Sequence, residues 1–249
     1  MRRAACAMLL LAGLAVAARA EAACRQALAL GLDVSGSVDA REYRLQLDGL
    51  ADALAAPEIR EALFAIPAAP VAVAAYEWSG PAPARDILGW TEIADEAALL
   101  AVTARLRAAR RAPGDDSTAL GHAMRHGAAL LAARPDCWRH VLDISGDGKA
   151  NAGPAPRSVR SSFRGITVNA LVVGADARDS LDRRQVQIGE LSSYFNAHVI
   201  HGPDAFVETA LGYEDFARAM RRKLLRELSA PSLATLDPAG PGHPAHRSQ

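Results

Sequence analysis

Asp33, Ser35 and Ser37 lie two residues apart in the sequence "DVSGSVD", at the end of an apolar run over residues 26–33. In an extended segment, alternate side chains point to the same side, and a turn at Gly36 would curl the three side-chain oxygens around one point. Carboxylate and hydroxyl oxygens are hard ligands that suit a divalent cation such as Mg²⁺. The spacing therefore predicts a cation site at the end of a buried strand.

Two further polar segments could supply ligands to the same cation. In "DDSTALGHAM", Thr118 opens a segment with helical spacing, and in "LDISGDG" Asp147 follows an apolar run. A hydroxyl and a second carboxylate would extend the set of oxygen ligands. Both assignments have rivals nearby in the sequence. Ser117 competes with Thr118, and the competitors of Asp147 are Asp115, Asp116 and Asp143.

Other phosphate-binding and nucleophilic motifs do not fit these segments. No G-x-G-x-x-G follows the first strand, and G-x-S-x-G is absent at both serines. The segment "GDGKAN" fails as a P-loop, because Asp143 replaces the first glycine and Ala150 replaces the final Ser or Thr. A phosphatase of the aspartyl-phosphate type would need a second carboxylate at position 35. One simpler interpretation stays open, in which Ser35, Ser37 or Asp39 caps the following helix.

Apolar runs alternate with segments of helical spacing along the chain. The expected strands are 26–33, 70–78, 86–90 at an edge, 138–145, 165–174 and 197–202. The expected helices are 39–56, 95–109, 118–133, 181–193 and 204–228. Strands that are apolar throughout and separated by helices predict an α/β fold with a doubly wound, mostly parallel sheet covered by helices on both faces. Ligands of such sheets bind at the carboxyl ends of the strands, where the polar segments lie.

The two ends of the chain differ from the middle. Residues 1–22 combine a basic start, an apolar stretch and small residues, which is the pattern of a secretory signal peptide. We therefore expect an exported protein, periplasmic or extracellular, without stable membrane insertion, because the remaining segments are too short to span a bilayer. Residues 229–249 are rich in Pro and Gly and are predicted to be a disordered tail. One domain, 24–228, remains between them.

The overall charge argues against one class of partner. The chain of 249 residues carries 28 basic and 28 acidic residues, so its formal net charge is zero. A general nucleic-acid binder usually carries a basic excess. We therefore expect no nucleic-acid partner.

The polar residues at the strand ends also match a known family pattern. Asp33, Ser35 and Ser37 form the D-x-S-x-S signature, so the chain resembles the von Willebrand factor A (vWA) domain with its metal-ion-dependent adhesion site (MIDAS). The resemblance runs from about residue 26 to residue 227. In that family a Thr opens a middle helix and an Asp follows the fourth strand, which Thr118 and Asp147 match. The segment that contains Asp147 departs from the family's T-D-G, because it reads S-G-D-G and is one residue longer.

A second, closer resemblance supports the predicted fold but gives no information about the ligand. The segments "YEWSG", a later "GW" and "SGDGKANAG" look like an uncharacterised group of exported proteobacterial vWA proteins, a domain of unknown function. In the wider family, Ser35, Ser37 and Thr118 would supply oxygens to the metal. Asp33 and Asp147 would act directly or through waters.

The resemblance implies a metal-dependent adhesion or scaffold function. A bound Mg²⁺, or Mn²⁺ or Ca²⁺, would keep one position open for an exposed carboxylate of a partner protein. We expect no catalysis. Two alternatives stay open, a metal-dependent hydrolase and a structural envelope protein with a vestigial site. The hydrolase lacks a base, because neither site turn contains His or Glu and Lys149 would be protonated.

Two cysteines remain after the removal of a signal peptide that contains Cys6. Cys24 and Cys137 in an exported protein predict one disulfide. The strand order of the vWA family implies that the two residues lie at the same end of the neighbouring first and fourth strands, opposite the metal. The alternative is two unpaired thiols.

Overall fold

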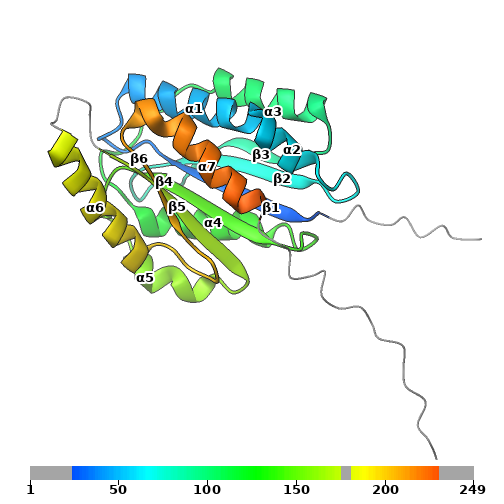
Figure 1. Ribbon diagram of the computed structural model, residues 1–249. Helices are drawn as coiled ribbons and strands as arrows, with labels where there is room; N and C mark the ends of the chain where they lie inside the picture. Colours follow the sequence, from blue (N-terminus) through cyan, green and yellow to red (C-terminus); the bar gives the residue numbers. More distant parts are fainter. Residues whose placement is uncertain (1–23, 175–180, 230–249) are drawn as a thin grey trace, which may run out of the picture.

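Six strands form one sheet in the order β3-β2-β1-β4-β5-β6 (Figure 1). The computed structural model describes residues 24–174 and 181–229, so the predicted signal peptide and residues 230–249 of the predicted tail lie outside the described residues. The strands are β1 (Gln26–Asp33), β2 (Val71–Trp78), β3 (Arg85–Ile93), β4 (His140–Gly146), β5 (Ile166–Val173) and β6 (Val207–Ala210). The α-helices are α1 (Ala40–Ala55), α2 (Pro57–Phe64), α3 (Glu96–Ala108), α4 (Leu120–Ala132), α5 (Pro156–Val159), α6 (Leu181–His198) and α7 (Phe216–Ser229). Two 3₁₀ turns are η1 (Arg160–Ser162) and η2 (Tyr213–Asp215).

The sheet is mostly parallel. The β1–β2, β1–β4, β4–β5 and β5–β6 pairs are parallel, and only the edge strand β3 runs antiparallel to its neighbour β2. This arrangement confirms the doubly wound α/β fold. Because β1 and β4 are parallel neighbours, the segments that follow them lie side by side at the same edge of the sheet.

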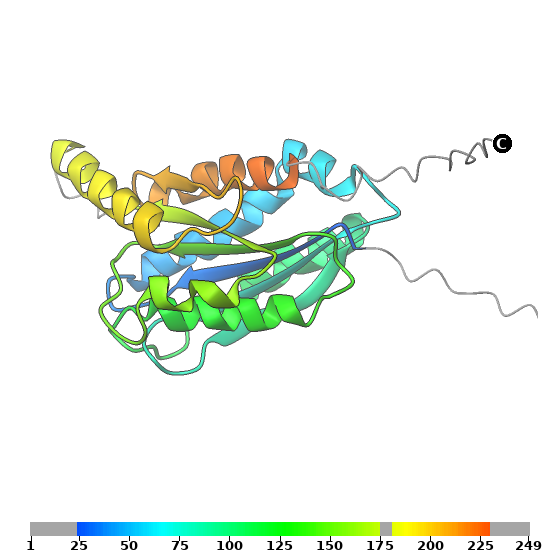
Figure 2. The same cartoon turned by 90° about the horizontal axis from the view of Figure 1, so that it is seen from below.

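Helices cover both faces of the sheet. Leu28, Leu30 and Leu32 of β1 belong to a core with α1, α2, α3 and α7, whereas Ala27 and Ala29 face a second core with α4, α5 and α6. This split follows from the alternation of side chains along a strand. Figures 1 and 2 show α1, α3 and α7 on the opposite side of the sheet from α4 and α5.

Close packing positions α4, the helix that follows Thr118. The Tyr76 hydroxyl donates to the carbonyl of Ala123 in α4 at 2.8 Å. The ring needs glycines on both sides, because a Cβ at Gly31 would lie 2.6 Å from it and a Cβ at Gly127 would lie 2.7 Å from its oxygen. Small residues on β1 and α4 thus let the helix sit close to the sheet.

The last part of the chain differs from the prediction. The expected strand at 197–202 is wrong, because α6 continues to His198 and the following segment forms one isolated bridge, between Val168 and His201. The sixth strand is β6, inside the segment predicted as a helix from residue 204, and α7 begins only at Phe216. The β6 sequence VETA is short, and three of its four residues are half-buried. It therefore carries too weak an apolar pattern for recognition as a strand.

Candidate metal centre

The five predicted ligands meet at the carboxyl ends of β1 and β4. Asp33 is the last residue of β1, and Ser35 and Ser37 lie in the turn between β1 and α1. Thr118 lies just before α4, and Asp147 directly follows β4. The structure thus brings together residues from three separate segments, at the edge where α/β sheets bind ligands.

Side-chain oxygens connect the three segments in a continuous row. Thr118 Oγ1 lies 3.5 Å from Ser35 Oγ, which lies 3.3 Å from Ser37 Oγ. Ser37 Oγ donates to Asp147 Oδ1 at 2.6 Å. Thr118 and Ser35 are buried, whereas Ser37 is exposed, so the row of oxygens reaches solvent at Ser37.

The turn after β1 is fixed by its own hydrogen bonds. The backbone N–H of Ser35 donates to Asp33 Oδ1 at 2.8 Å, and the N–H of Val38 donates to the Ser35 carbonyl at 3.0 Å. Asp39 caps α1, because its carboxylate accepts from the Glu42 N–H at 2.8 Å and the Glu42 carboxylate accepts from the Asp39 N–H at 2.9 Å. The cap of α1 is therefore Asp39, and neither serine takes that role.

A close backbone approach holds the Thr118 segment against this turn. The N–H of Gly36 donates to the Asp116 carbonyl at 3.2 Å. A Cβ at Gly36 would lie 2.9 Å from the Asp116 Cβ, so a residue without a side chain is needed here. The Thr118 N–H donates to the side-chain oxygen of Asn151 at 2.7 Å, which ties the same segment to the loop after β4.

Asp33 has one carboxylate oxygen without a partner. The residue is fully buried, and within the described residues Oδ2 has no hydrogen-bond donor. The backbone leaves little room there, because a Cβ at Gly146 would lie 3.1 Å from this oxygen. A buried carboxylate oxygen without a partner is costly unless a cation or a donor satisfies it.

Burial perturbs both site carboxylates. Desolvation and the charge of Asp147 raise the pKa of Asp33 to about 8, against weaker opposing hydrogen bonds from Ser35 and from the backbone of Asp147. Burial also raises the pKa of Asp147, although Ser37 and Tyr213 donate hydrogen bonds to it. Asp33 is fully buried and Asp147 is half-buried; two such carboxylates near one another disfavour ionisation, and a bound divalent cation would reverse this preference.

The donor set fits the implied cation. It consists of three hydroxyl groups and two carboxylates, all hard oxygen ligands of the kind that Mg²⁺, Mn²⁺ and Ca²⁺ prefer. The unpartnered Oδ2 of Asp33 and the row of hydroxyl groups next to it are the features that a cation would satisfy.

Three of the four rival ligands are engaged elsewhere. Asp115 accepts from the N–H and hydroxyl of Ser117 within its own turn, at 2.8 and 2.7 Å. Asp143 is buried in the core, where its Oδ2 lies 2.6 Å from Lys223 Nζ. These contacts favour Thr118 and Asp147 as the members of the site.

Sequence reasoning missed supporting residues around the site. Tyr213 in η2 is buried, and its hydroxyl donates to Asp147 Oδ2 at 3.3 Å. Gln46 of α1 donates to the Asp33 carbonyl at 2.9 Å. Neither contact has a local signal, because the partners lie 66 and 13 residues apart and no motif joins them.

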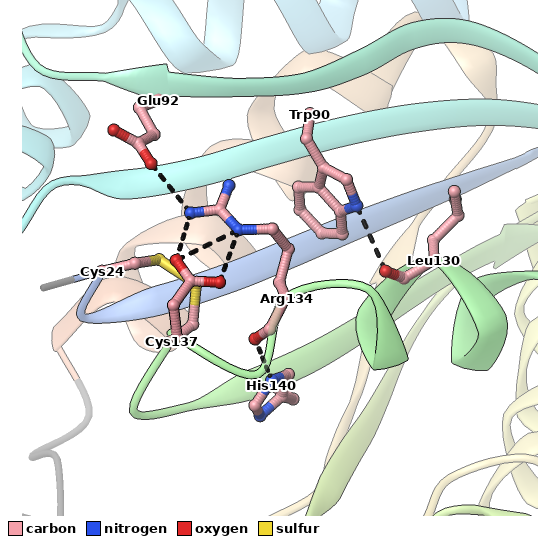
Figure 3. The surroundings of a disulfide bond; sticks show 8 residues. Cys24, Trp90, Glu92, Leu130, Arg134, Cys137 and His140 are labelled. Atoms are coloured by element: carbon pink, nitrogen blue, oxygen red, sulfur yellow. Dashed lines mark hydrogen bonds and ion pairs between the residues drawn. A yellow bond between two sulfur atoms is a disulfide. The ribbon is translucent and has the colours of Figure 1, made fainter. Parts of the chain in front are cut away.

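The predicted disulfide lies at the other end of the same strands. Cys24 and Cys137 are bonded, and Figure 3 shows the bridge beside the start of β1. Their Cα atoms lie 4.3 Å apart, and the two residues form an isolated parallel bridge. The cysteine sulfurs and Asp136 also form a cluster with the spacing of metal ligands, but the disulfide occupies both sulfurs.

Comparisons with known proteins identify a family and a fold. The family model described as "Protein of unknown function (DUF1194)" matches residues 23–232. No curated protein sequence matches the chain. Among the described residues, no helix has the length and apolar character needed to cross a membrane.

Solved structures of vWA-like proteins share the fold. Proximal thread matrix protein 1 from the mussel byssus superimposes with a TM-score of 0.57 and 14% identity, covering 84% of this chain and 49% of that chain. The same mussel protein with a zinc-occupied MIDAS motif has a TM-score of 0.55 and 16% identity, over 83% and 46%. A von Willebrand factor type A structure from Catenulispora acidiphila has a TM-score of 0.52 and 13% identity, over 82% and 43%.

A pilus adhesin is also similar. SpaC from Lactobacillus rhamnosus GG superimposes with a TM-score of 0.54 and 13% identity, over 82% of this chain and 30% of SpaC. The chain thus spans less than half the length of each of these proteins. At such low identity the superpositions show a shared vWA-like fold.

Proposed function

The chain belongs to the DUF1194 family of proteins of unknown function, and from this premise we propose that it is an exported protein-binding domain that acts through a bound divalent cation. The cation would be Mg²⁺ or a related ion such as Mn²⁺ or Ca²⁺. The group recognised would be an exposed carboxylate of a partner protein. The proposed function is binding, without catalysis.

One observation carries this proposal. Five oxygen-bearing side chains from three distant segments converge beside a buried carboxylate oxygen that has no partner within the described residues. Ser35, Ser37 and Thr118 would supply hydroxyl oxygens, and Asp33 and Asp147 would supply the negative charge. Such a convergence would be costly in a purely structural role, because it brings the half-buried carboxylate of Asp147 near the fully buried one of Asp33.

The balance of ligands suits recognition of an anion. When bound, the cation supplies a Lewis-acidic centre that attracts a further negatively charged oxygen. Three of the five groups are neutral hydroxyls, so the two carboxylates balance only the charge of the ion itself. The exposed position of Ser37 supports a site that opens toward solvent.

The similar structures support the same class of function. One of them is a pilus adhesin and another is a thread matrix protein, and the latter has a structure with a zinc-occupied MIDAS motif. These facts favour protein recognition through a metal, and they add Zn²⁺ to the ions worth testing. An extracytoplasmic location fits the predicted signal peptide.

Calorimetric titration tests the first half of the proposal. Mg²⁺, Mn²⁺, Ca²⁺ and Zn²⁺ are titrated into protein stripped of metal with a chelator. We expect one site whose affinity is lost in Asp147→Ala and kept in Ser117→Ala, a control that removes an exposed hydroxyl outside the proposed set. A protein that binds none of the ions would instead be a structural domain with a vestigial site.

Affinity capture from the native cell envelope tests the second half. The immobilised protein is incubated with envelope extract in Mg²⁺ or in chelator, beside Ser35→Ala and Ser117→Ala. We expect prey that is lost with chelator and with Ser35→Ala and retained by the control. Prey that is indifferent to the metal and to Ser35 would refute metal-bridged binding. Turnover of phosphoester or peptide substrates by the metal-loaded protein would support a hydrolase.

A further inference from the structure

Trp78, the last residue of β2, has a polar group without a partner beside the candidate metal centre. The residue lies in the segment "YEWSG" and is 3% exposed, and within the described residues its indole Nε1 has no hydrogen-bond acceptor. A buried N–H without an acceptor costs free energy, as does the buried Asp33 Oδ2 without a donor. An unsatisfied donor and an unsatisfied acceptor thus occur in the same part of the sheet.

Trp78 and Asp33 lie side by side on one face of the sheet. They are register partners in the parallel pair of β1 and β2, and Figure 1 shows β1 between β2 and β4. Side chains of register partners in neighbouring parallel strands point to the same face. Trp78 belongs to the core that packs against α4, so the carboxyl group of Asp33 lies on that face as well.

The two polar groups lie around one position, next to Gly146 of β4. A Cβ at Gly146 would lie 3.1 Å from Asp33 Oδ2 and 3.5 Å from Trp78 Cζ2. The ring atoms Cζ2 and Nε1 are both bonded to Cε2, so they share one edge of the indole. The edge that carries the N–H therefore lies next to Gly146 and the carboxylate of Asp33.

The surroundings favour a contact between these two groups. The fully buried ring of Phe195 closes the same space, with its Cζ 3.6 Å from the Cβ position at Gly146, and it offers no hydrogen-bonding group. Gly146 adds no side chain. The Trp78 N–H and Asp33 Oδ2 are not hydrogen-bonded to each other. One water can join two buried polar groups that lie near one another in this way.

We propose that Trp78 is a positioning residue of the metal centre, whose indole N–H holds Asp33 Oδ2 through one bridging water. The inference rests on the proposed function and deepens it, because it gives a residue outside the five ligands a role in cation affinity. The N–H donates to the water, and the water donates to the carboxylate. This contact would fix the direction of the carboxylate before the cation binds, and a preorganised ligand loses less conformational entropy on binding.

The indole N–H resonances test the contact directly. The chain contains three tryptophans, Trp78, Trp90 and Trp138, so the isotope-labelled protein gives three indole signals in nuclear magnetic resonance spectra, which Trp→Phe variants assign. Mg²⁺ is titrated into protein stripped of metal with a chelator. We expect the Trp78 signal to shift with the same saturation curve as calorimetric Mg²⁺ binding. The signals of Trp90 and Trp138 should stay in place.

Two variants separate the N–H from the packing of the ring. Trp78→Phe keeps an aromatic ring in the core and removes the donor, so we expect Mg²⁺ affinity to fall about fivefold, as the loss of one hydrogen bond predicts. Trp90→Phe is the matched control. Its indole N–H donates to the Leu130 carbonyl at 3.1 Å, near the disulfide (Figure 3). This variant should bind Mg²⁺ within about twofold of the wild-type protein.

The outcomes distinguish the role of Trp78 from the function on which it depends. Mg²⁺ binding that leaves the Trp78 signal unshifted, or that is equally strong in Trp78→Phe, would overturn the positioning role and leave the proposed function intact. Equal losses of affinity in the two variants would do the same, because they would assign the effect to packing. A wild-type protein that fails to bind Mg²⁺ would overturn both.

Discussion

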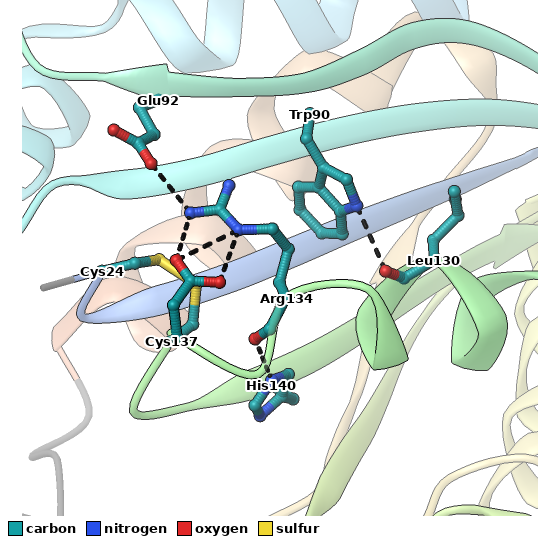
Figure 4. Close-up of polar contacts among 8 residues, drawn as sticks. Cys24, Trp90, Glu92, Leu130, Arg134, Cys137 and His140 are labelled. Carbon is teal, nitrogen blue, oxygen red and sulfur yellow. Dashed lines mark hydrogen bonds and ion pairs between the residues drawn. A yellow bond between two sulfur atoms is a disulfide. The ribbon is translucent and has the colours of Figure 1, made fainter. Parts of the chain in front are cut away.

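The carboxylates near the two ends of strand β1 lie in contrasting environments. At the amino-terminal end, beside the disulfide, Arg134 pairs with Asp136 at 2.7 Å and with Glu92 at 2.8 Å, and Figure 4 shows the contact between this arginine and Glu92. At the carboxyl end, Asp33 is fully buried and keeps one oxygen without a donor in the described residues. The two ends are joined by a strand of only eight residues.

The pKa shifts follow the same division. The hydrogen bond from Arg134 lowers the pKa of Asp136, whereas burial and the charge of Asp147 raise the pKa of Asp33 to about 8. The amino-terminal end thus pairs these carboxylates with an arginine and adds a covalent link. The carboxyl end holds a buried carboxyl group whose ionisation is disfavoured unless a cation binds. On the proposed function, the disulfide end contributes to stability and the Asp33 end to recognition.

Removal of the disulfide should have the largest effect. Cys24 and Cys137 are separated by 113 residues, and closure of a loop of that size is worth about 5 kcal/mol in the chain-entropy description. We expect the double Cys→Ser variant to lose about this much free energy of unfolding, measured by denaturant titration. Its Mg²⁺ affinity should stay within about twofold, because the sulfurs lie at the opposite end of β1. A loss below about 1 kcal/mol, or a large fall in affinity, would contradict the division between the two ends.

The next effect is a dependence of stability on pH in the presence of chelator. The pKa of Asp33 is about 8 in the folded state and near 4 in the unfolded chain. As pH rises between these values, the unfolded state loses its proton first, so the free energy of unfolding falls. Asp33→Asn should reduce this fall by more than about 1.4 kcal/mol, the equivalent of one pKa unit, in denaturant titrations at a series of pH values.

Asp136→Asn is the matched control for this dependence. Arg134 lowers the pKa of Asp136, so this variant should keep the fall between about pH 5 and about pH 8. Saturating Mg²⁺ should abolish the fall in the wild-type protein, because the cation favours the ionised carboxylates. An identical slope in Asp33→Asn and wild type would assign the dependence to other groups, such as Asp143, whose pKa burial raises to about 7.

A smaller effect is expected at the hydroxyl groups. Ser35→Ala removes the central oxygen of the row between Thr118 and Ser37 and should weaken Mg²⁺ binding at least about tenfold, measured by calorimetry. Ser117→Ala should change it less than about twofold, because that hydroxyl bonds within its own turn. Equal affinities for the two variants would remove Ser35 from the set of ligands.

The smallest effect is expected from Tyr213. Its hydroxyl donates to Asp147 Oδ2 at 3.3 Å, and a hydrogen bond of this kind is worth about 0.5–1.5 kcal/mol. Tyr213→Phe should therefore weaken Mg²⁺ binding about threefold, with the fold unchanged by circular dichroism. Unchanged affinity would show that Asp147 is positioned without the tyrosine.

The sequence predicts the placement of Asp33 and Asp147 at one edge of the sheet, and their role as metal ligands stays a prediction. Asp33 and Asp147 each follow an apolar run, and parallel neighbouring strands bring such ends together. The disulfide is predictable for the same reason, because it closes the opposite ends of β1 and β4. Strand periodicity therefore predicts the strand ends, and the resemblance to the vWA family supplies the pairing of β1 with β4 that brings them together.

The supporting contacts could not be predicted in this way. Tyr213 reaches Asp147 only because η2 and α7 return to the sheet after the short strand β6, which has no clear apolar pattern. The requirement for a glycine at position 36 could not be predicted either, because it arises from the close packing of Asp116 against this residue. Contacts between segments distant in the chain depend on tertiary packing, which local pattern does not encode.

The most direct test of the central claim is a crystal structure of the protein grown with Mn²⁺, with anomalous diffraction recorded to locate the ion. We expect one strong anomalous peak within coordination distance of Ser35 Oγ and Ser37 Oγ, beside the carboxylates of Asp33 and Asp147. The peak should be absent from crystals of Asp147→Ala. No peak at this edge of the sheet, or a peak that persists in the variant, would contradict the claim that these residues form a metal centre.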